Sequence, residues 1–243
     1  MEEELNKKTK IIIGIILSLL CLGFQALTYK AADFFINIFN LNYNIPKIDK
    51  IDNLIPLLTI FIVPYILAYV YWIIAPVCAS IVNIKHLLNI ILAYIIINII
   101  AFIIFLIYPT YINRIEENIY NENPNDFFGW LSKIIYDSDG KEKGYNLFPS
   151  MHCMTTTICF FATFRKKEIP LWYRICSFII AILICLSTVF VKQHYIIDSL
   201  VGILIAISVW LIINKFNLGY KLLNKPIYYF INKFKNKEKK ENE

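Results

Sequence analysis

Six long apolar runs limit what this chain can fold into. They are Ile11–Leu27, Leu54–Ile74, Leu87–Tyr108, Pro149–Phe164, Leu171–Val191 and His194–Ile213. A helix that crosses the hydrocarbon core of a bilayer needs about 20 apolar residues. Five runs meet this length, and the fourth comes close to it only if its helix starts near Phe148. The pattern predicts an all-α membrane protein with six transmembrane helices in a bundle.

The composition agrees with a single membrane domain. Charged residues make up 17% of the chain, against about 25% in soluble domains. No Gly/Ser/Pro-rich linker divides the sequence, so we expect one six-span domain over residues 1–213, with its motifs between 108 and 202. The first run has no convincing cleavage site and is interpreted as a retained helix, not a signal peptide. Residues 29–53 are expected to include a short interfacial helix.

Basic residues predict the orientation of the spans. Of the 24 Lys and Arg residues, 16 fall at the termini and in the second and fourth loops. The positive-inside rule therefore places both termini in the cytoplasm of a multi-pass protein of the cell membrane. The net charge of +6 is interpreted as topological, with the lipid bilayer as partner and no nucleic acid. The lysine-rich segment 214–243 is expected to be a cytoplasmic tail, interfacial at first and then disordered.

The same topology brings two histidines together. With six spans, the fourth and the sixth both run inward, so His152 and His194 should lie at the outer face at similar depth. His194 and Asp198 are four residues apart, which places them on one face of a helix. A carboxylate within a span is unfavourable unless it is paired, and it often marks a functional site. The alternative is a polar pair that joins helices or caps the sixth helix.

The segment FPSMH suggests an anion site at a helix start. Pro149 suits the first turn of a helix, where early backbone amides and the Ser150 hydroxyl can bind an anion. Arg114 and Lys192, also expected at the outer face, could hold a phosphate. Each of these residues also has a simpler interpretation, as an interfacial histidine or a cation facing lipid headgroups.

Taken together, these residues indicate phosphoryl transfer through a phosphohistidine. One histidine would attack phosphorus and the other would protonate the departing alcohol. Neither a metal nor a cofactor is required. A metal site of His152, His194 and Asp198 would lack a fourth ligand, and the six cysteines include no CxxC pair.

Two stretches resemble the type 2 phosphatidic acid phosphatase superfamily. FPSMH is similar to its Pro-Ser-x-His motif, and STVFVKQHYIID resembles its third motif, which ends His-x-x-x-Asp and is followed here by Gly202. The resemblance implies a metal-independent helical bundle with an outward-facing site. In that site His194 would be the nucleophile, Asp198 its partner and His152 the acid.

The chain departs from the family pattern at its cations. Ser187-Thr188 stands where the third motif has Ser-Arg, so Lys192 is a candidate replacement for the arginine. In the first motif Arg114 matches the arginine, but Ile107 and Ile115 stand where a lysine and a proline are expected. These departures look similar to the branch that contains sphingomyelin and inositol phosphorylceramide synthases.

The expected function is hydrolysis of a membrane lipid phosphate or pyrophosphate ester. Transfer of a phospho-headgroup to an acceptor lipid alcohol is the alternative, and a non-enzymatic transporter is a third. The long polar segment 109–147 is expected at the outer face, where its stretch DSDGKEKG is interpreted as a solvated turn. The sequence leaves the lipid, the acceptor and the oligomeric state open.

Overall fold

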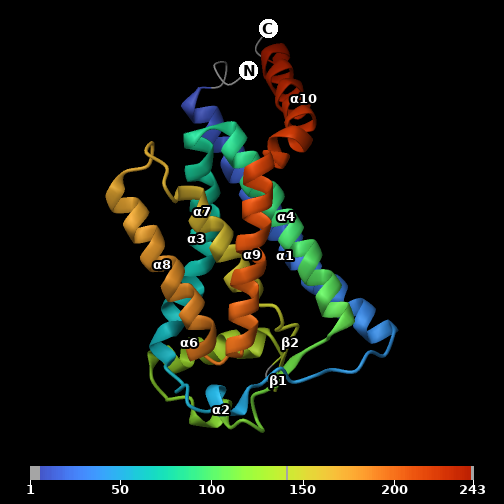
Figure 1. Cartoon of the computed structure of the whole chain (residues 1–243), viewed down its shortest axis with the longest axis vertical. Coiled ribbons are helices and arrows are strands. Elements are labelled where there is room, and N and C mark those ends of the chain that lie inside the picture. The colour runs from blue at the N-terminus through green and yellow to red at the C-terminus, as the bar shows by residue number, and fades with distance from the viewer. Residues whose placement is uncertain (1–5, 141, 242–243) are drawn as a thin grey trace.

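The computed structural model describes residues 6–140 and 142–241. Within them, five helical segments are long and apolar enough to cross a membrane. They are α1 (Lys7–Ile38), α3 (Ile62–Val82) with the 3-10 turn Thr59–Phe61 before it, α4 (Ile84–Ile107), α8 (Leu171–Phe190) and α9 (Ile196–Phe216). They pack as an elongated bundle (Figure 1). The predicted all-α membrane class is confirmed.

The fourth apolar run forms a different kind of helix. Helix α7 (Met151–Thr163) has 13 residues, about 20 Å of length, whereas the hydrocarbon core is about 30 Å thick. It begins after Ser150 and ends before the charged segment that starts at Arg165. Most of its residues are buried, and it contacts α3, α4, α8 and α9. Helix α7 is therefore a short buried helix inside the bundle.

Two other helix boundaries differ from the prediction. Helix α1 continues to Ile38 because no proline or glycine interrupts the segment from Leu27, and it ends just before Asn40, whose φ is +48°. The separate interfacial helix expected in residues 29–53 is thus largely the last part of α1. Helix α3 begins only at Ile62, after the 3-10 turn, because Leu58 is extended and its N donates to Phe190 O.

The connections at one end of the bundle form a folded cap. This cap contains α2 (Asp49–Asp52), β1 (Tyr111–Asn113), α5 (Ile119–Glu122), α6 (Phe127–Ser138) and β2 (Lys143–Tyr145). Strands β1 and β2 pair antiparallel, with Ile112 opposite Gly144. A small apolar cluster joins the cap to the bundle; it contains Ile112, Ile119, Tyr136, Leu147 and Tyr195.

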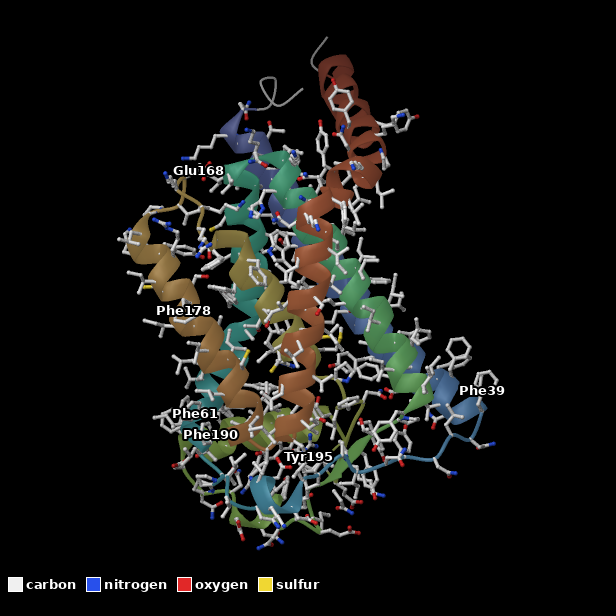
Figure 2. All side chains as sticks on the ribbon, in the orientation of Figure 1. Phe39, Phe61, Glu168, Phe178, Phe190 and Tyr195 are labelled. Carbon is white, nitrogen blue, oxygen red and sulfur yellow. The ribbon has the colours of Figure 1, made fainter. Side chains whose placement is uncertain are left out.

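The start of α1 and helix α10 (Leu218–Glu241) lie at the other end of the bundle, opposite the cap and Tyr195 (Figures 1 and 2). The disorder expected within residues 214–243 is wrong, because residues 218–241 are helical. Helix α10 packs against α4, where Tyr220 N donates to Asn89 Oδ1 at 3.3 Å. The side on which each end faces the cell stays a prediction from the basic residues.

Candidate active site

His194 lies in a short loop between α8 and α9. Helix α9 begins at Ile196, so His194 precedes the helix and does not share a helical face with Asp198. The two residues meet because Asp198 caps the helix: its Oδ2 accepts a hydrogen bond from Tyr195 N at 2.9 Å. The same Oδ2 lies 3.6 Å from His194 Nδ1, and Asp198 is fully buried. The predicted pair is present, but it arises because Asp198, the third residue of α9, accepts from the backbone of the N-cap residue Tyr195.

His152 is the second residue of α7. The N-cap is Ser150, whose Oγ accepts from Cys153 N at 3.4 Å, so Pro149 precedes the helix instead of starting it. Ser150 N donates to Asp198 O at 3.0 Å. The fully buried Ser150 therefore caps α7 and ties its start to α9, and it is not among the residues that line the cavity described below.

Gly202 allows the two histidine-bearing segments to approach each other. A Cβ at this position would lie 2.8 Å from Ser150 O, which is closer than ordinary van der Waals contact. Only glycine gives α9 this approach to the start of α7. As a result, the ring centroids of His152 and His194 are 6.2 Å apart. Both rings line the cavity described below.

Aromatic rings of α3 hold the His152 ring. Tyr65 stacks on it at 4.3 Å between centroids with a 20° interplanar angle, and Trp72 lies 5.0 Å away. Trp72 itself is fixed by a hydrogen bond from its Nε1 to Thr156 Oγ1 at 3.0 Å. His152 is 7% exposed, and neither ring nitrogen has a hydrogen-bond partner in residues 6–140 and 142–241. Both nitrogens thus keep hydrogen-bonding capacity that no described residue uses.

A cavity of about 520 Å³ opens beside the two histidines. Its wall comes from α1, α3, the cap and the loop before α9. The polar or charged lining residues are Gln25, Lys30, Asp33, Ser138, Asp139, Asn146, His152, Gln193 and His194. The aromatic lining residues are Tyr29, Tyr65, Tyr69, Trp72 and Tyr145. The cavity has room for more than a phosphoryl group.

Arg114 lies behind this cavity. Its guanidinium is fully buried, 4.9 Å above the Tyr136 ring. Its Nη2 donates to Gln193 Oε1 at 3.0 Å and to Asp139 Oδ2 at 3.4 Å, and both acceptor residues line the cavity. Gly144 makes room for the guanidinium, since a Cβ there would lie 2.5 Å from Nη2. Arg114 thus reaches the site only through its partners.

Charge and burial shift the pKa values of Arg114 and Asp139 in opposite directions. Burial raises the pKa of Asp139, while the nearby Arg114 and His194 lower it. Burial also lowers the pKa of Arg114, and Asp139 counteracts this effect. The stretch DSDGKEKG turns at Asp139 and Gly140, which are exposed as expected, but the Asp139 carboxylate also pairs with the buried Arg114 guanidinium beside the cavity.

Lys192 points away from the cavity. Its Nζ donates to Asp52 O at 3.1 Å and to Ile55 O at 2.5 Å, and it is not among the lining residues. Its φ of +50° lies in the left-handed region. The structure does not bring Lys192 to the position expected for a phosphate ligand, because the 48–55 segment supplies carbonyl groups for its ammonium.

Distant segments hold the His194 loop in place. Tyr136 OH donates to Val191 O at 2.8 Å, and Ile196 N donates to Asp52 Oδ1 at 2.9 Å. Asp52 is buried, so this second bond caps α9 from the α1–α3 connection. Together with the bonds of Lys192, these contacts determine where His194 stands relative to α7.

Reasoning from the sequence missed several cavity residues. Gln25 lies within the first apolar run, yet its Oε1 accepts from Tyr94 OH at 3.1 Å and from Thr155 Oγ1 at 3.0 Å. A polar residue in the middle of an apolar run is the one signal that could have marked α1 as part of the site. The aromatic residues of α3 carried no such signal.

Comparison with protein families gives one result. The model of the PAP2 superfamily matches residues 83–219, which is more than half of the chain. The matched region contains Arg114, Ser150, His152, His194 and Asp198, and it excludes α1 and α3. Searches of curated proteins and of solved structures found no match.

Proposed function

The chain belongs to the PAP2 superfamily, the type 2 phosphatidic acid phosphatases, and on that premise we propose that it hydrolyses a lipid phosphate or pyrophosphate ester. Membership of this family and the apolar helices give a multi-pass membrane enzyme of the phosphatase or phosphotransferase kind. The proposal adds the reaction, the catalytic residues and the orientation. The cap end of the bundle, which holds the site, would face the outside of the cell membrane, with both termini in the cytoplasm.

One observation carries the proposal: two imidazoles, 6.2 Å apart, line the same cavity, and one of them has a buried carboxylate beside it. His194 Nδ1 faces Asp198, so a proton on Nδ1 leaves the lone pair of Nε2 free to attack. The 3.6 Å separation from Asp198 can shorten when the imidazole gains charge, as catalytic hydrogen bonds do in complexes. This arrangement supports His194 as the nucleophile.

In the first step, His194 Nε2 attacks phosphorus and forms an N–P bond. The bond between phosphorus and the ester oxygen breaks, and its electron pair stays on that oxygen. His152 donates a proton to this oxygen, so the lipid leaves as an alcohol, or as a lipid monophosphate if the substrate is a pyrophosphate. The absence of other partners for the His152 nitrogens in the described residues supports this role.

In the second step, neutral His152 accepts a proton from a water molecule. The water oxygen attacks phosphorus, the N–P bond breaks, and its electron pair returns to Nε2 of His194. Inorganic phosphate leaves, and His152 has regained its proton for the next cycle. Such acid–base catalysis contributes roughly 10²–10⁴-fold to the rate.

Transfer to an acceptor lipid alcohol is the second candidate. The substrate would then be a phosphodiester lipid, so that the first step leaves the phospho-headgroup on His194 Nε2, and the acceptor alcohol would replace water in the second step with the same proton movements. The cavity volume of about 520 Å³ favours this possibility, since water alone would not need such space. A new phosphodiester lipid, formed when an acceptor alcohol is added, would distinguish transfer from hydrolysis.

The test is phosphate release from a panel of lipid phosphates by purified protein, with a base quench that preserves phosphohistidine. We expect His194→Ala to abolish both turnover and the phosphorylated protein. His152→Ala should slow alcohol departure, least for esters of acidic alcohols, and Asp198→Asn should lower the rate. His86→Gln serves as control. This third histidine does not line the cavity, and its Nε2 forms a hydrogen bond of 3.0 Å with Ala162 O. Full activity of His194→Ala would refute the mechanism.

A further inference from the structure

The cavity has an unusual balance of charge for a phosphate site. Among its lining residues in the described chain, Asp33 and Asp139 are acidic and Lys30 is the one lysine or arginine. Arg114 is buried behind Asp139, and Lys192 is directed to backbone carbonyls. A phosphate monoester carries a charge of about −1.5 to −2 at neutral pH. A cation that contacts it directly must therefore come from elsewhere, and Lys30 is the candidate on the cavity wall.

Helix geometry places Lys30 near the depth of His152. Gln25 of α1 bonds Thr155 of α7 at 3.0 Å, so these two residues lie at one level. From this level α1 runs toward the cap for five residues to Lys30, about 7.5 Å, while His152 lies three residues nearer the cap on α7, about 4.5 Å. The Lys30 backbone is therefore only about 3 Å nearer the cap than that of His152.

The Lys30 ammonium is free to bind a ligand. It makes no hydrogen bond or ion pair with any residue that the structure describes. The neighbouring acid on the same helix, Asp33, accepts a hydrogen bond from Asn146 Nδ2 at 2.6 Å. The helix beneath Lys30 is held firmly, since the Tyr29 ring stacks on Phe105 at 5.6 Å between centroids. A flexible four-carbon stem on a fixed helix can follow the position of an anion.

We propose that Lys30 binds an anionic oxygen of the substrate phosphoryl group beside the two histidines. The inference deepens the proposed function and rests on it. It assigns a substrate-binding cation to α1, outside residues 83–219, where the family resemblance provides none. It also accounts for Ile107, which stands where a motif lysine is expected and is 78% exposed, away from the cavity.

Two measurements on the full chain in detergent test this role. The first is steady-state hydrolysis of a short-chain diacylglycerol phosphate, and the second is equilibrium binding of orthovanadate, which needs no turnover. Loss of a charge-assisted contact should weaken vanadate binding and raise KM by about 10- to 100-fold in Lys30→Met. The value of kcat should change much less, because the contact exists before and during the reaction. Lys30→Arg should restore most of the binding.

Lys50→Met is the matched control, because Lys50 is an exposed lysine of α2 that does not line the cavity. It removes the same charge from the cap end and should leave both measurements unchanged. Equal KM and vanadate affinity in wild type and Lys30→Met would overturn this inference and leave the proposed function standing. Lys30-dependent vanadate binding without hydrolysis would support the inference and refute the proposed function. Wild-type protein that neither binds vanadate nor hydrolyses the ester would overturn both.

Discussion

The contact between α9 and α7 at Gly202 offers a quantitative test of the site geometry. An alanine Cβ would lie 2.8 Å from Ser150 O, whereas ordinary contacts begin at 3.4 Å. The helices would have to separate by about 0.6 Å, and overpacking of this kind costs about 1–3 kcal/mol. Replacement of a helical glycine by alanine stabilises the helix itself by about 0.5–1 kcal/mol, which offsets part of this cost. We expect Gly202→Ala to lower the free energy of unfolding by about 1–2 kcal/mol.

The substitution should also lower the activity of the folded protein. Ser150 caps the helix that carries His152, so a shift of α7 away from α9 widens the gap between the two imidazoles. Misplacement by 1 Å can cost about 10²-fold in rate, so a shift of about half that size should lower kcat by about 10-fold. Thermal unfolding in detergent and hydrolysis of a chromogenic aryl phosphate measure the two effects.

A glycine elsewhere in the bundle provides the control. Gly23 lies in α1, and a Cβ there would have no neighbour within 4 Å. Gly23→Ala should keep full activity and should be as stable as wild type or slightly more so. If Gly202→Ala retained wild-type kcat, the close approach of the two helices would not be what positions the histidines, and our account of the site would be wrong.

Two further substitutions test the charged residues around the site. Burial raises the pKa of Asp139, so its carboxylate should become neutral as the pH falls toward that pKa and should stop repelling an anionic substrate from the cavity wall. The KM of wild type should therefore decrease relative to that of Asp139→Asn as the pH is lowered toward that pKa; a constant ratio would refute this repulsion. Lys192→Met should lower kcat and the unfolding temperature through loss of its bonds to Asp52 and Ile55, with KM nearly unchanged. A large rise in KM alone would instead support the phosphate contact expected from the sequence.

The sequence predicted the chemical centre of this site better than its surroundings. Hydropathy and the parity of the spans placed His152 and His194 at one end of the bundle, since this conclusion needs only the number of chain reversals between them. The short α7 did not alter it, because a helix of 13 residues still reverses the chain direction. Spacing also identified the pairing of His194 with Asp198, although a capping interaction produces it.

The direction of two charged side chains could not be predicted from the sequence. Lys192 was expected to face phosphate, but its left-handed backbone and two carbonyls from a segment about 140 residues away direct its ammonium elsewhere. Asp139 lies in an exposed turn, as expected, but the fold of the cap also brings its carboxylate to Arg114, 25 residues earlier. Both outcomes depend on contacts between segments that no local pattern encodes.

The proposed reacting groups and the cavity wall come from two different parts of the chain. The groups proposed to make and break bonds lie on α7 and just before and within α9, inside the region that matches the family. Much of the cavity wall belongs to α1 and α3, outside that region: Tyr65 and Trp72 hold the His152 ring, and Lys30 supplies the free cation. Because these wall residues would contact a ligand without reacting with it, their chemistry can differ while the reaction stays the same. The choice of substrate should therefore be determined by α1 and α3, and substitutions there should change KM and substrate preference before they change kcat.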